Sequence, residues 1–280
     1  MPCMGDDIAF ALKPSLWAKD VLGFDADKIQ CQILDSTSKR IIVNCHRQRG
    51  KSTIASLICL HRAIYYPESL CLIVAPALRQ SQENFRKILE DLNRMEEMPE
   101  LQEDTKLSLT LANKSRILSL PGGNEGRTIR GFSGPSIIVE DESARCSDTL
   151  YQALRPMLAS NPNGKLILCS TPWGQRGHFY KIWTEESGWS KVKVVASENP
   201  RISPAFLAEE RQSLGSWIYK QEYEGGFVAL EGQLFSEELI ESLFDSGVKP
   251  LFSSNRAGSD HKIANIIDLS AKPLFKSGAG

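Results

Sequence analysis

The chain has 280 residues, of which 41% are hydrophobic and 24% are charged, and its formal net charge is −1. This length allows one large α/β domain with an appendage, or two small domains, and the composition is typical of an ordinary soluble protein. The near-zero net charge argues against a uniformly basic nucleic-acid-binding protein, although a local basic channel is compatible with it.

The seven cysteines contain no C-x-x-C pair, and several lie in apolar runs, where a free thiol behaves as a small hydrophobe. We therefore expect a reducing, cytosolic setting. The N-terminus has no basic region followed by a long apolar stretch, so no secretory signal is expected. Because no segment reaches the roughly 18 apolar residues that span a bilayer, we expect no membrane association.

Residues 14–34 predict one or two short helices, because apolar residues recur there at helical spacing. Gln30 lies in this stretch, some twenty residues ahead of a Gly-Lys-Ser-Thr sequence at 50–53. From there its amide could hydrogen-bond an adenine edge. A solvated glutamine is the simpler interpretation, and the position alone favours it.

The first functional signal is the segment Asn44–Thr53, which follows the apolar run Ile41–Val43 and precedes apolar residues at helical spacing. It therefore lies where a buried strand turns into a helix. There the backbone N–H groups and the helix dipole face an anion, Lys51 can reach β- and γ-phosphates, and the Ser52 hydroxyl can ligate Mg²⁺. Chance is the alternative, because Gly-Lys-Ser/Thr occurs in roughly one chain in ten of this length and Cys45 replaces the usual leading glycine.

After this loop, residues 70–75 form a near-continuous apolar run, which is typical of a central parallel strand. Residues 78–98 predict a long amphipathic helix. Its polar start at 79–81 is most simply a solvated face; contact with nucleotide or DNA is the alternative, since ligands bind at the carboxyl ends of strands in open α/β sheets. The alternation at 107–111 and 116–120 predicts a hairpin.

Arg127 and Arg130 follow in a glycine-flanked loop, where solvent exposure is the simplest interpretation unless the next strand is catalytic. That strand, at 136–142, ends in Asp141 and Glu142. Asp141 is placed to hold Mg²⁺, directly or through water, and Glu142 to polarise a water for in-line attack on a γ-phosphate. Acidic pairs are common on surfaces, but this one follows a buried strand in the same chain as the phosphate loop. Together they predict a Mg²⁺-nucleotide site.

A helix capped by Asp148 is predicted to run to residue 159, and a buried strand at 165–169 ends in Ser170 and Thr171. Hydroxyls at this third strand end could sense a γ-phosphate; a simple strand-end turn is the alternative. The remaining predicted elements are an aromatic-rich helix around 179–183, a strand at 191–196, a helix capped by Ser203, and a last amphipathic segment at 231–244, in a pattern that loosens from Trp217 onward.

The ordered set Arg47–Thr53, Ile137–Glu142 and Cys169–Gly174 resembles the large terminase subunit of tailed bacteriophages. The resemblance runs from about residue 14 to residue 235. It extends to stretches between the motifs, among them Ala75-Pro76, Gln80-Ser81, Arg130-Gly131, Leu150–Pro156 and Gly177–Tyr180. Members of this family are ATP-driven DNA-packaging motors that join an N-terminal P-loop ATPase to a C-terminal RNase H-like nuclease.

The resemblance implies an α/β fold of the P-loop NTPase class (RecA/ASCE-like), with a mostly parallel central sheet flanked by helices and a short irregular C-terminal extension. It divides the chain into three segments. These are an N-terminal helical, adenine-side segment (1–36), the ATPase domain (37–230), and a linker with the truncated start of a nuclease domain (231–280).

The resemblance also implies roles for single residues. Glu142 would be the catalytic glutamate, and Arg47 the loop arginine that couples nucleotide state to domain movement. Arg130 lies where some terminases carry an arginine finger that acts on the ATP of a neighbouring subunit.

The implied cofactors are ATP and Mg²⁺. Ser52 and Asp141 would hold the metal, and Ser170 and Thr171 would form the coupling motif. The implied nucleotide-binding set is Gln30, Arg47, Gln48, Arg49, Gly50, Lys51, Ser52 and Thr53.

The implied function is that of an ATPase motor that translocates double-stranded viral DNA into a procapsid. Its partners would be DNA, a portal protein, the terminase small subunit and further copies of the chain in a homo-oligomeric ring on the portal. The implied location is the cytoplasm of the bacterial host and, transiently, the procapsid. Two alternatives stay open: a helicase-like DNA-dependent ATPase, which would need a second RecA-type domain of about 150 residues, and a truncated prophage remnant that binds nucleotide without packaging.

The C-terminal part departs from the family pattern. Two-metal DNA cleavage needs a cluster of carboxylates on several strands. Ile266–Leu269 resembles a first nuclease strand with Asp268 as its aspartate, but only 45 residues follow Phe235. We therefore expect no nuclease activity from this chain, which would be either an excised ATPase region or a naturally truncated copy.

Overall fold

The computed structural model describes residues 4–123 and 129–229. The chain divides into two compact units, Met1–Gln233 and Leu234–Gly280, and all of the described residues lie in the first. The amphipathic segment predicted at 231–244 and the strand predicted around Asp268 lie outside the described residues. The division into three segments stays a prediction.

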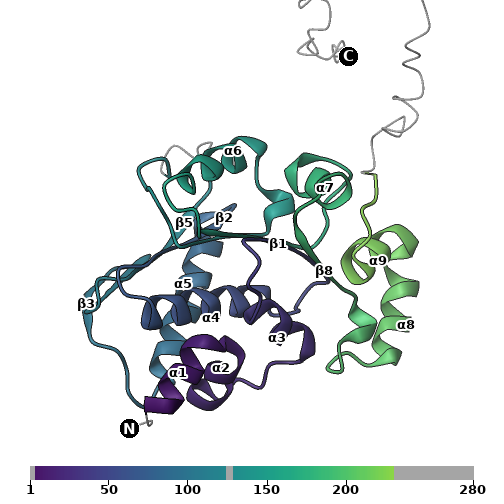
Figure 1. Cartoon of the computed structure of the whole chain (residues 1–280). Coiled ribbons are helices and arrows are strands. Elements are labelled where there is room, and N and C mark those ends of the chain that lie inside the picture. The colour runs from purple at the N-terminus through teal and green to yellow at the C-terminus, as the bar shows by residue number, and fades with distance from the viewer. Residues whose placement is uncertain (1–3, 124–128, 230–280) are drawn as a thin grey trace, which may run out of the picture. The chain divides into compact units, whose positions relative to one another are not determined.

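A sheet of eight strands runs through the first unit in the order β3-β4-β5-β2-β6-β7-β1-β8 (Figure 1). The strands are β1 (Arg40–Cys45), β2 (Leu70–Ala75), β3 (Leu101–Asp104), β4 (Ser108–Leu111), β5 (Arg116–Pro121), β6 (Ile137–Asp141), β7 (Lys165–Ser170) and β8 (Ser190–Val194). All pairings from β5 to β8 are parallel, whereas β4 pairs with β3 and β5 in antiparallel fashion. Every residue of β2 and β6 is buried, as expected for central parallel strands covered on both faces.

Helices cover both faces of this sheet. They are α1 (Met4–Leu12), α2 (Pro14–Leu22), α3 (Lys28–Leu34), α4 (Lys51–Tyr65), α5 (Leu78–Asn93), α6 (Asp148–Met157), α7 (Gly177–Thr184), α8 (Pro204–Ser213) and α9 (Gly215–Glu224). Figure 1 shows α1–α5 on one side of the sheet and α6 and α7 on the other. The predicted α/β fold with a mostly parallel, helix-flanked sheet is confirmed. No helix in the described part of the chain is long and apolar enough to cross a bilayer.

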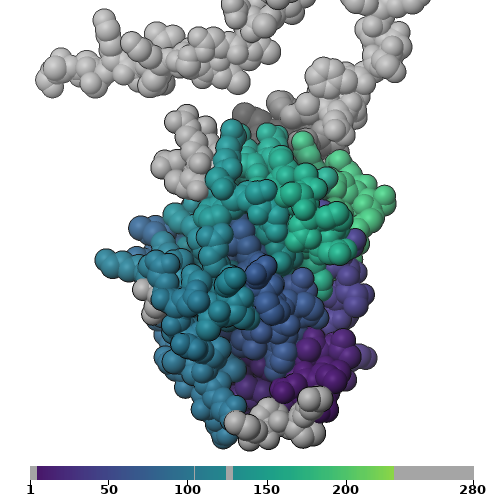
Figure 2. Space-filling model, turned by 60° about the vertical axis from the view of Figure 1, so that its left-hand side comes forward, coloured from purple at the N-terminus to yellow at the C-terminus, as the bar shows by residue number. Residues whose placement is uncertain are grey.

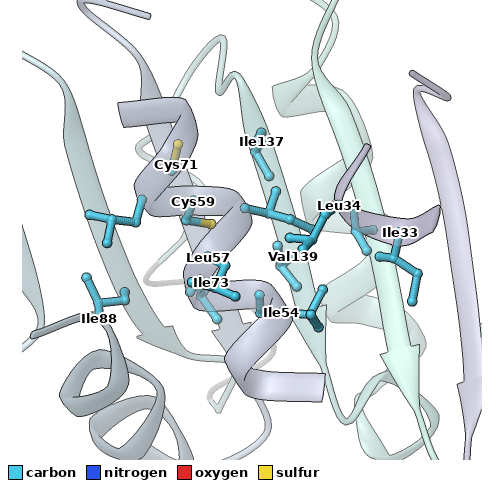
Figure 3. Close-up of a cluster of buried hydrophobic side chains, with 14 of the residues drawn as sticks. Ile33, Leu34, Ile54, Leu57, Cys59, Cys71, Ile73, Ile88, Ile137 and Val139 are labelled. Atoms are coloured by element: carbon cyan, nitrogen blue, oxygen red, sulfur yellow. The ribbon is translucent and has the colours of Figure 1, made fainter. Parts of the chain in front are cut away.

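The sheet separates two hydrophobic clusters, because successive residues of a strand point to opposite faces. In β1, Ile41 and Val43 belong to the cluster under α2–α5, whereas Ile42 belongs to the cluster under α6 and α7. Figure 3 shows Leu57 of α4 against Val139 of the sheet. In the space-filling view, the N-terminal helices and the α8–α9 pair occupy separate regions of the surface (Figure 2).

Some predicted helix bounds are wrong. The helix predicted to reach residue 98 ends at Asn93. Glu96 and Glu97 would face the negative end of the helix dipole, and Pro99 disfavours a helical residue before it. The loosening pattern after Trp217 lies in a regular helix, α9, which buries Tyr219. Its hydrophobic pattern is weak because its two buried residues, Tyr219 and Gln221, both carry polar groups.

The cap predicted for α6 is also wrong. Ser147, not Asp148, accepts the hydrogen bond from the Leu150 N–H (3.2 Å), and Asp148 contacts His178 instead. Strand β8 ends at Val194, two residues early, because a short 3₁₀ helix begins at Ala196. Helix α1 and strand β3 are additions that the pattern did not predict.

Candidate active site at the carboxyl ends of the central strands

The loop between β1 and α4 has the conformation of an anion cradle. Gln48 (φ 58°) and Gly50 (φ 83°) are left-handed, and Gly50 is the N-cap residue of α4. Left-handed residues in such a turn direct successive N–H groups to one side, and the positive end of the α4 dipole points the same way. Gln48 is exposed, and Thr53 lies half-buried in the first turn of the helix. The predicted order of strand, loop and helix is confirmed, and phosphate binding by the loop stays a prediction.

Cys45 explains how the loop manages without its usual leading glycine. It is the last residue of β1 and is 1% exposed, so its side chain points into the core beneath the loop. Burial raises the pKa of the Cys45 thiol to about 11, and the group is therefore neutral. It acts here as a small hydrophobic residue.

Lys51 joins the loop to the ends of two neighbouring strands. Its side chain is 7% exposed, and Nζ lies 3.1 Å from Thr171 Oγ1 and 3.5 Å from Glu142 Oε1. Burial opposes the charge of Lys51, but the acidic groups around it, Glu142 and Asp141 among them, outweigh burial and raise the pKa of Lys51 above its ordinary value. Lys51 is therefore a fixed positive charge at the point where β1, β6 and β7 end.

Asp141 has the surroundings of a metal-holding carboxylate. It is the last residue of β6 and is 3% exposed. Its Oδ2 accepts hydrogen bonds from Ser52 Oγ (3.1 Å) and Asn84 Nδ2 (3.0 Å), and its Oδ1 accepts one from the Glu142 N–H (3.1 Å).

A carboxylate beside a hydroxyl is the donor set that Mg²⁺ takes from P-loop proteins, where water and phosphate supply the other oxygens. The predicted pair of Ser52 and Asp141 therefore fits Mg²⁺. The described residues contain no cluster of three or more His, Cys, Asp or Glu side chains that could hold a metal by themselves.

Sequence reasoning missed Asn84. It lies on α5 and is 2% exposed, although its side chain is polar. A signal exists in the sequence, because Asn84 falls on the same helix face as the apolar Ile88. A polar residue on the apolar face of an amphipathic helix needs a buried partner, and here that partner is Asp141.

Glu142 is held in an uncommon backbone conformation. Its φ of 53° is left-handed, which is rare for a residue that is neither Gly, Asn nor Asp and is typical of active sites. Its carboxylate lies 3.5 Å from Lys51 Nζ and 3.9 Å from Arg145 Nε. It faces a cavity of ≈ 450 Å³, whose other lining residues include Ser52, Arg79, Gln80, Asn84 and Asp141. This cavity has room for a hydrated metal and a phosphate group.

The two hydroxyls of the predicted coupling motif play different parts. Thr171 contacts Lys51, as expected for a residue near the phosphate position. Ser170 is fully buried, and its Oγ donates to the Thr171 carbonyl (2.7 Å). Ser170 therefore shapes the turn, and Thr171 is the member of the pair that reaches the site.

Gln30 is not a solvated side chain. It is 4% exposed, its Oε1 accepts from the Asp27 N–H (3.1 Å), and its Nε2 donates to the Arg49 carbonyl (3.5 Å). Asp27 also forms an ion pair with Arg49 (2.7 Å), whose side chain is 8% exposed. Arg49 therefore points toward α3, and α3 is bonded to the phosphate loop from behind.

Arg47 and Arg130 both lie away from Lys51. The Arg47 side chain is 70% exposed and lies 3.4 Å from Glu222 of α9, whose carbonyl also accepts from the Arg47 N–H. Nearby, Asn44 Nδ2 donates to the Gly225 carbonyl (2.9 Å). Arg130 is exposed and lines a separate cavity with residues of α6. The structure therefore does not bring these two arginines into the cluster around Lys51, and their roles stay predictions.

Comparison with known proteins gives a consistent family. The N-terminal domain of the T4-like-virus-type terminase large subunit matches residues 45–242. The terminase large subunits of Escherichia phage T5 and Thermus phage G20c are each 26% identical to this chain over 80% of its length, and the matches cover 52% and 53% of those proteins. The chain thus spans about half the length of these curated relatives.

Solved structures support the fold. The ATPase domain of the Thermus phage P74-26 large terminase is 22% identical and has a TM-score of 0.68 over 78% of this chain and 100% of that one. The large terminase of the thermophilic bacteriophage D6E, in complex with ADP, is 14% identical and has a TM-score of 0.60 over 72% of this chain and 54% of that one. Because the family match covers most of the sequence, the chain belongs to the terminase large-subunit family, of the T4-like-virus type.

Proposed function

We propose that this chain is a Mg²⁺-dependent ATP hydrolase whose turnover drives double-stranded DNA into a viral procapsid. One observation carries the catalytic part of the proposal. Lys51 contacts Glu142 and Thr171, while the adjacent Ser52 contacts Asp141. A phosphate-binding cation, a metal-holding pair and a candidate catalytic acid thus form one connected group at the carboxyl ends of adjacent parallel strands.

The residues of this group would have separate roles in the transfer of a phosphoryl group to water. Mg²⁺ would neutralise charge that develops on the phosphate oxygens. Ser52 and Asp141 would hold it, and Lys51 would contact the β- and γ-phosphates. Phosphate oxygens at the loop would compete with Glu142 for Lys51. The Glu142 carboxylate would then be available to orient a water and accept its proton.

The nucleotide and the partners are proposed from the family. The D6E large terminase binds ADP and ATP-γ-S in its solved structures, which supports ATP as the nucleotide here. Family membership supports DNA, a portal protein, the small subunit and a homo-oligomeric ring as partners, acting in the bacterial cytoplasm and on the procapsid. The exposure of Arg130, away from the loop of its own chain, fits a residue that acts on a neighbouring subunit.

The test is ATP turnover by the full chain with and without double-stranded DNA, across a Mg²⁺ titration. Lys51→Ala and Glu142→Gln should both abolish turnover, and Glu142→Gln should still bind ATP because it leaves the phosphate loop intact. Undiminished hydrolysis in either variant would show that the site is misassigned. Turnover without added Mg²⁺, in the presence of a chelator, would refute the metal dependence.

A mixing experiment tests the trans role of Arg130. An Arg130→Ala subunit would keep its own phosphate loop but supply no finger to its neighbour, whereas a Lys51→Ala subunit would keep the finger and lose the loop. Mixing these two inactive variants should therefore restore part of the turnover, at sites where a Lys51→Ala subunit supplies Arg130 to an Arg130→Ala subunit. No recovery of turnover in mixed rings would refute a shared active site. Lys191→Ala, on the exposed surface of β8, is the matched control and should leave turnover unchanged.

A further inference from the structure

A second group of buried polar side chains lies on the opposite face of β6 from the site. Glu140 precedes Asp141 in this strand, so the two carboxylates point to opposite faces of the sheet. Glu140 is 0% exposed. Its Oε2 accepts hydrogen bonds from His178 Nε2 (2.7 Å) and from the Ser143 hydroxyl. Burying a carboxylate is costly unless it is paired, so this arrangement needs an explanation.

His178 provides the pairing charge. It lies in the first turn of α7, and its side chain is 5% exposed. Its Nδ1 lies 3.1 Å from Asp148 Oδ1, and its ring stacks on Tyr151 with centroids 4.5 Å apart. Although burial disfavours the charged ring, Glu140 and Asp148 outweigh burial and raise the pKa of His178. With a carboxylate at each ring nitrogen, both nitrogens are donors, and the ring is fixed in one orientation.

Ser143 connects this buried pair to the catalytic turn. Its hydroxyl contacts Glu140 and also lies 3.0 Å from His178 Nε2, and the residue is 0% exposed. Ser143 directly follows Glu142, the residue with the left-handed backbone. On the other side of Glu142, its own N–H is bonded to Asp141. The strained residue is therefore anchored at both of its neighbours.

A left-handed glutamate persists only where its surroundings fix it. The hydrogen bonds of Ser143 supply that restraint from the face of the sheet opposite to the one on which Asp141 contacts Ser52. Through His178, Ser143 also connects the turn to α7, which begins at Gly177. Thr171, which contacts Lys51, lies a few residues before this helix. A second contact joins the same two segments, because Arg145 lies over the Trp173 ring at 3.9 Å.

We propose that Glu140, Ser143 and His178 form a positioning cluster that holds the backbone turn at Glu142. The rate of the chemical step then depends on an α7 side chain that touches neither nucleotide nor metal. This inference rests on the proposed ATP hydrolysis. It adds that Ser143 and His178 act on turnover through Glu142 and leave ATP binding unaffected, because Lys51 and its loop keep their own contacts.

The test separates positioning from stability. Ser143→Ala keeps the contacts of His178 with Glu140 and Asp148 and deletes only the hydroxyl that links them to the turn. We expect kcat to fall about tenfold or more, since small misplacements of a catalytic group have effects of this order. The ATP KM and the affinity for a fluorescent ATP analogue should stay within about twofold. Ser160→Ala, an exposed serine on the same side of the sheet, is the matched control.

Two substitutions at His178 give an independent arm. His178→Phe keeps a ring beside Tyr151 but has no donor, whereas His178→Gln keeps an N–H donor for Glu140 and Ser143. We expect His178→Gln to retain more of the wild-type kcat than His178→Phe does. Ser143→Ala carries the test if His178→Phe fails to fold.

The outcomes are distinguishable. A wild-type chain without ATP turnover would refute the proposed function and this inference with it. Turnover in the wild type together with an unchanged kcat in folded Ser143→Ala would refute the positioning cluster alone. A loss of ATP-analogue binding in Ser143→Ala that matches its loss of kcat would also overturn it, because the cluster would then act on the whole loop.

Discussion

Asp27 joins α3 to the phosphate loop, and two substitutions separate the stability that it provides as a helix cap from the stability that it provides as an ion-pair partner. Its side chain accepts from the N–H groups of Ile29 (3.0 Å) and Gln30 (3.1 Å), which caps the helix, and it forms the ion pair with Arg49. Asp27→Asn keeps an oxygen for the cap but removes the charge, because asparagine is an equally good N-cap residue. Asp27→Ala removes both.

The expected losses in the free energy of unfolding follow from how deeply the Asp27 and Arg49 side chains are buried. Loss of an N-cap side chain costs about 1 kcal/mol. Breaking a fully buried ion pair costs about 3–5 kcal/mol, whereas an exposed pair contributes about 0–1 kcal/mol. The Arg49 side chain is 8% exposed and that of Asp27 is 31% exposed, so the pair lies between these limits. We expect a loss of about 2 kcal/mol for Asp27→Asn and about 3 kcal/mol for Asp27→Ala.

Urea unfolding of the full chain, followed by tryptophan fluorescence, measures both losses. Trp17 is fully buried beside α3 and reports on this region. Equal losses in the two variants would refute the cap, and an Asp27→Asn variant as stable as the wild type would refute the ion pair. If Asp27→Asn binds ATP and Mg²⁺ as tightly as the wild type does, both proteins should be stabilised by the same amount, and the loss in Asp27→Asn should stay the same.

Gly225→Ala should lower the free energy of unfolding by about 1–2 kcal/mol, because the φ of Gly225 is +64° and a Cβ there would lie 3.0 Å from an Asn44 oxygen. Gly188→Ala is the control in thermal unfolding. Its φ is +84° and no atom lies within 4 Å of the added Cβ, so it measures the backbone part of the cost alone. Burial lowers the pKa of His61 below 6.5. The contribution of His61 to the free energy of unfolding is therefore complete above pH 6.5 and is lost as the pH falls through the lower pKa. In urea unfolding at a series of pH values, His61→Gln should lose less stability below pH 6.5 than the wild type does, and an unchanged loss would contradict this. Asn84→Ala removes a hydrogen bond to the proposed metal-holding carboxylate, so half-maximal turnover should need about tenfold more Mg²⁺, and an unchanged Mg²⁺ requirement would contradict the role of Asn84.

The parts of the site that lie within one segment could be predicted from the sequence. The strand, loop and helix around Lys51 are contiguous, and the hydrophobic pattern sets both flanking elements. The proximity of Ser52 and Asp141 could also be predicted, because the carboxyl ends of parallel strands share one edge of a sheet. The register confirms this, since Asp141 pairs with Cys169 and Asn44 pairs with Ser170.

Side-chain partners across the fold could not be predicted in the same way. The burial of Gln30 depends on α3 packing behind the loop, which no local pattern specifies. Asp148 has a good sequence position for a helix cap, but the neighbouring Ser147 caps the helix, and Asp148 accepts a hydrogen bond from the His178 N–H instead. The contact of Glu140 with His178 joins residues that are 38 positions apart. Such contacts depend on how two layers meet, not on periodicity.

The hydrogen bonds from Asn44 and Arg47 to Gly225 and Glu222 have a mechanical consequence. They fasten the phosphate loop to the last described helix, shortly before the second unit begins at Leu234. A load applied to the chain beyond Gly225 would therefore reach the loop through a few backbone and amide bonds before it reached the rest of the sheet. Nucleotide bound at the loop and a force on the chain beyond Gly225 would therefore act on the same hydrogen bonds.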